Sequence, residues 1–153
     1  CSTAPGCGWP WGFAEAIADA LRAKGHEVDI HALEPEGEVQ PHQSGVKLKN
    51  LPDCGGYEVL LIGGPVWAFG MSPVALAYAA ELKDLGGKRI LPFATMAFPF
   101  RFMGGLQGIG SLTRALRAAG ATVLPGVVGT SWAKKSDAAR QALVARVTGL
   151  LGV

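Results

Sequence analysis

Apolar residues follow two different spacings along the chain, and these spacings predict its secondary structure. Positions 59–62 form an unbroken apolar run, which is typical of a strand buried on both faces of a sheet. In four other stretches apolar residues recur every three or four positions, which predicts amphipathic helices. The predicted helices span residues 13–24, 74–83, 111–119 and 137–151.

Further strands are predicted between these helices. Residues 27–33 alternate between polar and apolar positions, which indicates a strand near a sheet edge. We expect the run at 59–62 to stop at Gly63-Gly64-Pro65, and a polar connection to cover residues 34–50. The remaining predicted strands are 89–94, which contains a proline, and a last strand at 122–124 and 127–129, which Pro125-Gly126 interrupts.

This order of elements predicts an α/β fold in one domain, residues 1–153, with a mostly parallel sheet and helices on both faces. Apolar residues make up 49% of the chain and charged residues 17%, which excludes a disordered protein. The net charge of +2 does not favour nucleic acid or anionic membrane as a partner. No apolar segment approaches the roughly 20 residues of a membrane-spanning helix.

The three cysteines show no metal-ligand spacing, and we expect no metal site. Their odd number favours a reducing compartment, the cytoplasm, over a disulfide framework. Cys7 precedes a predicted helix, a position that lowers a thiol pKa. No histidine stands in a motif that would serve it as a base, so we assign no catalytic residue.

Three glycine-rich loops carry the candidate chemistry. Residues 1–12 form a hydroxyl- and glycine-rich loop before a helix, which is physically an anion site. The second loop follows the central strand and carries Trp67 and Phe69 before Ser72-Pro73, which reads as a helix start. The third loop, residues 95–110, follows the next strand and is rich in glycine and phenylalanine. Loops at the carboxyl ends of parallel strands are where α/β sheets bind ligands.

Taken together, these loops resemble those of the flavodoxin-like family, and the resemblance extends over nearly the whole chain. It implies a flavodoxin-like doubly wound parallel sheet of five strands in the order 2-1-3-4-5, which binds FMN at its switch point. Residues 2–8 resemble the family's phosphate loop, and residues 64–72 resemble the loop in which an aromatic side chain flanks the flavin ring. Residues 95–105 correspond to the second loop that flanks the ring.

The resemblance implies FMN as cofactor and the following cofactor-binding residues: Ser2, Thr3, Gly6, Cys7, Gly8, Trp9, Pro65, Val66, Trp67, Ala68, Phe69, Gly70, Thr95, Met96, Ala97, Gly104 and Gly105. The implied function is electron transfer with a redox partner protein. One alternative is an NAD(P)H-dependent FMN or quinone reductase of the same fold. The other is a module that has lost flavin binding. Homodimerisation is left open.

Three departures from the family pattern bear on these expectations. The family's first strand is missing from the sequence given, and we expect it to precede these residues in the protein. The phosphate loop is about three residues longer than in the family, with Pro10 and Trp11 where a hydroxyl residue is common. Family electron carriers are strongly acidic, whereas this chain is slightly basic, which favours a reductase or a specialised carrier.

Overall fold

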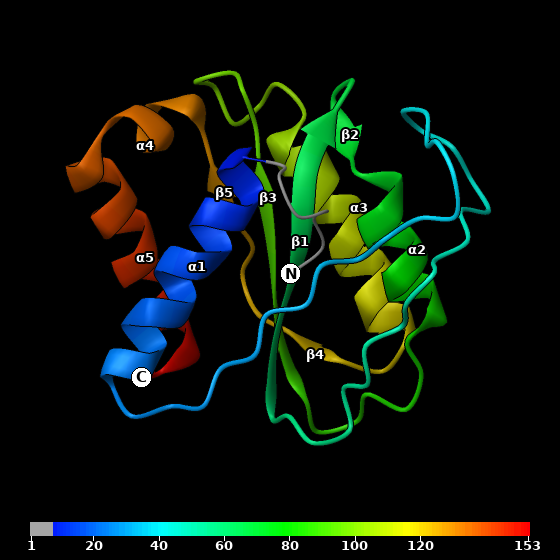
Figure 1. Cartoon of the computed structure of the whole chain (residues 1–153), viewed down its shortest axis with the longest axis horizontal. Coiled ribbons are helices and arrows are strands. Elements are labelled where there is room, and N and C mark those ends of the chain that lie inside the picture. The colour runs from blue at the N-terminus through cyan, green and yellow to red at the C-terminus, as the bar shows by residue number, and fades with distance from the viewer. Residues whose placement is uncertain (1–7) are drawn as a thin grey trace.

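A computed structural model of the chain describes residues 8–153. Five helices and five strands form within this part of the chain (Figure 1). In chain order they are α1 (Gly8–Ala23), β1 (Val59–Trp67), β2 (Gly70–Met71), α2 (Pro73–Glu81), β3 (Arg89–Thr95), α3 (Gly105–Ala118), β4 (Thr122–Val123), β5 (Val127–Gly129), α4 (Ser131–Lys135) and α5 (Asp137–Leu151).

The sheet is built around β1 and β3, which run parallel to each other in a register that pairs Val59 with Arg89 and Pro65 with Thr95. The short strands β4 and β5 both pair with β3 in parallel, β4 with its start and β5 with its end. On the other side β2 pairs antiparallel with the end of β1. The prediction of a mostly parallel sheet in an α/β fold is therefore confirmed.

Helices cover both faces of this sheet, as predicted (Figure 1). On one face α1 and α5 pack with Leu91 and Phe93 of β3, and on the other α2 and α3 pack with Ile90 and Ala94. These alternate positions of one strand belong to two separate core clusters. Both faces of β3 are therefore buried, which explains its nearly continuous apolar sequence.

The central strand is longer than predicted, because β1 continues through Gly63-Gly64-Pro65 to Trp67. The amide of Arg89 donates to the carbonyl of Glu58, so the even-numbered residues of β1 bond to β3. Pro65 is odd-numbered, and its missing N–H falls on the side of β1 away from β3. Its carbonyl accepts from the amide of Ser72 at 3.0 Å. A proline costs this strand no bond to β3.

Pro92 is accommodated in β3 for a related reason. The amide of Leu124 donates to the carbonyl of Ile90 at 2.8 Å, and the pairing with β5 resumes at Phe93. Pro92 lies between these points, opposite the interruption at Pro125-Gly126 that separates β4 from β5. The two breaks coincide, so no donor is needed there.

The predicted strand at residues 27–33 is wrong, because this segment is extended but pairs with no strand of the described residues. A groove of about 580 Å³ separates it from the outer edge of β1. Side-chain hydrogen bonds hold the segment instead, from Arg22 to the carbonyl of Val28 and from Asn50 to the carbonyl of Ala32. An extended segment cannot join a sheet across an intervening gap.

Two helices begin earlier than predicted. Helix α1 begins at Gly8, so residues 8–12 are helical, with Pro10 in the first turn, where a missing N–H costs nothing. Helix α3 begins at Gly105 and includes Gly108 and Gly110, which we expected in the loop. Helix α2 ends at Glu81, α5 has the predicted bounds with Ser136 as its N-cap, and the short α4 was not predicted.

Candidate functional site

The second and third predicted site loops lie at one edge of the sheet. Strands β1, β3 and β5 are parallel, so their carboxyl ends meet at the edge drawn at the top of Figure 1. The β1–β2 turn, the residues between β3 and α3, and α4 all follow these strand ends. The described part of α1 also begins at this edge (Figure 1).

The β1–β2 turn holds two residues in an unusual backbone conformation. Ala68 has φ 45° and Phe69 has φ 65°, the left-handed region that favours glycine or asparagine. Nε2 of His42 lies 2.7 Å from the carbonyl oxygen of Ala68, and a Cβ at Gly70 would lie 2.7 Å from Cε1 of the same ring. His42 therefore braces a strained turn, and such strain is typical of ligand-binding loops.

The second and third loops touch each other at Gly104. This residue has φ 99°, and a Cβ built on it would lie 2.5 Å from Cα of Phe69. The ring of Phe69 also stacks on Phe98, with centroids 6.1 Å apart and planes 10° from parallel. Behind them, a Cβ at Gly105 would lie 2.9 Å from Sδ of Met96. Glycines thus let two aromatic loops approach backbone to backbone.

Two buried polar atoms beneath this edge have no hydrogen-bond partner within residues 8–153. They are Oγ1 of Thr95 and Nε1 of Trp9. A Cβ at Gly129 would lie 3.3 Å from Cζ2 of Trp9 and 3.7 Å from Cγ2 of Thr95, so the two side chains flank the end of β5. Buried polar atoms are nearly always paired, and two orphans beside one helix N-terminus indicate a place for a polar group.

The structure brings the described candidate residues to this one edge. Gly8 and Trp9 start α1, and Pro65 to Gly70 form the end of β1 and the turn. The residues from Thr95 onward lie at the end of β3 and the start of α3; they are Thr95, Met96, Ala97, Gly104 and Gly105. The remaining candidates lie outside the described residues; they are Ser2, Thr3, Gly6 and Cys7.

Sequence reasoning missed two residues of this edge. His42 lies in a connection 26 residues before Ala68, and no local spacing relates the two. Gly129 was seen only as the end of a strand, although a glycine at a carboxyl strand end is itself a signal for close approach.

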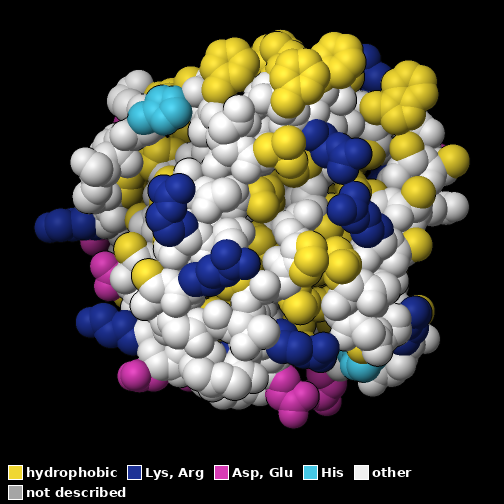
Figure 2. Space-filling view, turned by 180° about the vertical axis from the view of Figure 1, so that it is seen from behind, with side chains coloured by type: hydrophobic (Ala, Val, Ile, Leu, Met, Phe, Trp, Pro, Cys, Tyr) yellow, Lys and Arg dark blue, Asp and Glu magenta, His cyan; other side chains and the backbone are white. Residues whose placement is uncertain are grey.

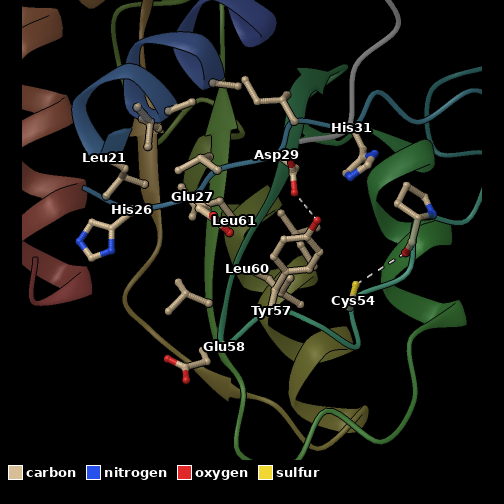
Figure 3. A pocket seen from close by; sticks show the side chains of 18 of the residues that line it. Leu21, His26, Glu27, Asp29, His31, Cys54, Tyr57, Glu58, Leu60 and Leu61 are labelled. Carbon is tan, nitrogen blue, oxygen red and sulfur yellow. Dashed lines mark hydrogen bonds between the residues drawn. The ribbon is translucent and has the colours of Figure 1, made fainter. Parts of the chain in front are cut away.

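The groove beside β1 is a different kind of cavity (Figure 3). Apolar side chains of α1, including Ile17 and Leu21, form one wall, and Leu60 and Leu61 of β1 form another. The hydroxyl of Tyr57 donates to Asp29 across its mouth. It runs along a strand edge and lies away from the loops that carry the candidate chemistry.

Two tyrosines near this groove have altered ionisation. Burial, with a hydrogen bond to Cys54 at 2.9 Å, raises the pKa of Tyr78 far above its ordinary value. The hydroxyl of Tyr78 also lies 2.7 Å from the carbonyl oxygen of Pro52. The hydrogen bond to Asp29 raises the pKa of Tyr57. Both phenols are held neutral, which suits a structural role.

Within residues 8–153 there is no cluster of three or more histidine, cysteine or acidic side chains that could hold a metal ion. No helix in that range has the length and apolar character to cross a membrane.

Comparison with known proteins gives matches at the level of structure. The sequence matches no family model and no curated protein. The structure is similar to that of flavodoxin 2 from Bacillus cereus, with a TM-score of 0.74 over 99% of this chain and 95% of the other. The chain has a flavodoxin-like fold.

A second flavodoxin-like neighbour is a short-chain flavodoxin associated with a non-canonical PDU bacterial microcompartment. Its TM-score is 0.68, over 99% of this chain and 93% of that one. Both neighbours are 17% identical to this chain in sequence. The flavodoxin-like fold expected from the sequence is therefore confirmed, while function rests on the site itself.

Proposed function

We propose that the protein binds FMN at the carboxyl edge of its sheet and transfers electrons. The observation that carries this proposal is the convergence, at that edge, of two aromatic loops and two buried polar atoms that have no partner among the described residues. In the proposal the ring lies against the β1–β2 turn and the loop before α3, and the phosphate lies toward the N-terminus of α1.

The residues present fit this cofactor. The phosphate of FMN is an anion that needs several donors, and the first turn of α1 offers backbone N–H groups and a favourable dipole. Thr95 is 1% exposed and its hydroxyl has no partner among the described residues, so a polar ligand group would satisfy it. The indole Nε1–H of Trp9 is a second donor in the same state.

The aromatic residues would position the flavin ring. Trp67 is half-buried and Phe69 is 57% exposed, so both have surface available for a planar ligand. Phe69 and Phe98 now stack on each other, and ring binding would separate them or cover their outer faces. When bound, FMN supplies reversible electron acceptance, and the chain tunes it through the contacts to the ring.

A matched pair of threonine substitutions tests the proposal. We expect Thr95→Val to leave the fold intact and to weaken FMN binding about fivefold, because a neutral hydrogen bond in a buried site is worth roughly 1 kcal/mol. The control is Thr148→Val, since the Thr148 hydroxyl already donates to the carbonyl of Ala145 at 3.0 Å. It should cost stability and leave FMN affinity unchanged.

The readout is a titration of FMN fluorescence with purified protein, together with the absorbance of flavin that travels with the protein. A protein that neither quenches micromolar FMN nor retains any colour contradicts the proposal. It would support the alternative of a fold that has lost the cofactor.

A reductase is the second candidate function. The exposed phenylalanines between β3 and α3 and the absence of a strongly acidic surface favour an open face for nicotinamide or a quinone over a carrier's docking surface. Steady consumption of NADPH with a quinone acceptor by the flavin-loaded protein would establish the reductase. A carrier would accept electrons once and turn over only with a partner protein.

A further inference from the structure

Exposed apolar side chains lie on several elements at the carboxyl edge of the sheet. Phe100, Phe102, Leu106 and Trp132 are 56%, 66%, 57% and 70% exposed, and we call them the aromatic rim. They come from the loop after β3, the first turn of α3 and the first turn of α4. Figure 2 shows apolar rings gathered along this end of the molecule. None of the four is among the residues proposed to bind FMN.

The aromatic rim stands out from the surface. The groove beside β1 and the hollow between α1 and α5 are lined by other parts of the chain. Phe100 and Phe102 stack on each other, with centroids 5.6 Å apart, and both remain more than half exposed. Anchor residues of protein interfaces typically pair with pockets. Exposed Phe, Leu and Trp side chains at one end of a molecule also occur where a chain enters a lipid interface.

The charges of residues 85–136, the stretch that contains the aromatic rim, are all of one sign. Residues 85–136 contain no aspartate or glutamate, and all twelve acidic residues of the chain lie outside them. The same residues include seven basic ones: Lys88, Arg89, Arg101, Arg114, Arg117, Lys134 and Lys135. Neither ion pair between described residues involves any of the seven. On the face in Figure 2 the acidic side chains lie away from the aromatic end.

Three of these cations adjoin the rim in sequence. Arg101 lies between Phe100 and Phe102, and Lys134 and Lys135 follow Trp132 in α4. An anionic membrane surface has acyl chains below and phosphates above. The apolar side chains suit the acyl chains, and the cations, which form no ion pair among the described residues, suit the phosphates.

We propose that the aromatic rim docks the protein peripherally on anionic lipid membranes. The four rim side chains enter the boundary between headgroups and acyl chains, and Arg101, Lys134 and Lys135 contact lipid phosphates. The carboxyl edge of the sheet then faces the bilayer. The inference does not rest on FMN binding, because neither the rim nor its cations depend on a cofactor.

Flotation with lipid vesicles tests this inference. The purified chain, with and without added FMN, is mixed with phosphatidylcholine vesicles that contain about 30% phosphatidylglycerol, in about 0.1 M salt. Vesicles of pure phosphatidylcholine are the lipid control. We expect the protein to float with the anionic vesicles and to remain in solution with the neutral ones.

Matched variants assign the contact to the rim. Phe100→Ser/Phe102→Ser should weaken vesicle binding by about tenfold or more, because the lost rings no longer enter the interface. Lys134→Glu/Lys135→Glu should weaken it by about tenfold or more through charge. The controls Leu51→Ser and Lys49→Glu/Lys83→Glu alter exposed residues outside the carboxyl-edge loops and should change binding by less than about twofold.

A fluorescence measurement reports the depth of contact. Tryptophan emission should shift to shorter wavelength on addition of anionic vesicles, and Trp132→Phe should abolish the shift. Absence of flotation overturns the inference, as do control variants that weaken binding as much as the rim variants. Binding to soluble polyglutamate as tight as to vesicles, and insensitive to Phe100→Ser/Phe102→Ser, also overturns it and identifies a polyanion site.

Discussion

Replacement of Gly104 by alanine tests whether the two aromatic loops are held together by direct backbone contact. Gly104 has φ 99°, and an added Cβ would lie 2.5 Å from Cα and 2.8 Å from the carbonyl carbon of Phe69. The chain offers two controls with the same chemical change. Gly120 has φ 88° with nothing within 4 Å of its Cβ position, and Gly110 lies in α3 with ordinary φ and open space.

The three sites separate two costs. A residue other than glycine that is held at positive φ destabilises the fold by about 1 kcal/mol or somewhat more. Forced contact with backbone atoms that cannot rotate away adds about 2 kcal/mol, the middle of the range for overpacking. Alanine also reduces the freedom of the unfolded chain, which stabilises every variant by up to about 1 kcal/mol. The expected losses are therefore about 2–3 kcal/mol for Gly104→Ala and about 0–1 kcal/mol for Gly120→Ala. Gly110→Ala should gain about 0.5–1 kcal/mol.

Thermal unfolding followed by circular dichroism measures these differences. For a chain of this size about 1 kcal/mol shifts the Tm by roughly 2–4 °C, so Gly104→Ala should unfold about 4–12 °C lower. Equal losses at Gly104 and Gly120 would refute the reasoning, because backbone conformation alone would then account for both. If the proposed function holds, Gly104→Ala should also weaken FMN binding, whereas Gly120→Ala should not.

Two further predictions follow from the edge of β1 and from the tyrosines. Amide hydrogen exchange should be slow at Leu60 and Ile62, whose N–H groups point toward β3, and faster at Leu61, whose N–H points to the open side of β1. Equal protection of all three amides would contradict an open edge. The pKa of both tyrosines is raised above the ordinary 10.0, by a hydrogen bond to Asp29 for Tyr57 and chiefly by burial for Tyr78. Their contribution to stability is therefore present below about pH 10 and is lost as the pH rises above it. Phenolate absorbance of the folded protein should lag behind that of the protein unfolded in urea, and Tyr78→Phe should reduce the loss of stability at alkaline pH.

Much of the fold could be predicted from local pattern. The spacing of apolar residues located the four longer helices and the strands β1, β3, β4 and β5. Each helix must bury one apolar stripe, and a strand inside a covered sheet must bury both of its faces. Two errors of extent came from glycine and proline. Gly63-Gly64-Pro65 reads as a strand end, yet Pro65 lies on the side of β1 where no donor to β3 is required. Gly105, Gly108 and Gly110 read as a loop, yet they lie within α3.

The strand expected at residues 27–33 shows the limit of pattern most clearly. Its alternation is real, but a strand exists only where a neighbour accepts its hydrogen bonds, and a groove lies between this segment and β1. Net charge likewise says nothing about how charges are distributed along the chain. A total of +2 gives no sign that residues 85–136 carry seven basic and no acidic side chains, or that the exposed rings of the aromatic rim lie in that same stretch.

The sequence by itself determined the α/β class, the flavodoxin-like resemblance and the loops in which to seek a site, because hydrophobic period and turn residues act over short distances. Only the tertiary structure brought His42 to Ala68, Gly104 to Phe69, and Trp9 and Thr95 to Gly129. Those contacts join residues far apart in the chain. They depend on strand order and on helices packing from both faces, which no local spacing encodes.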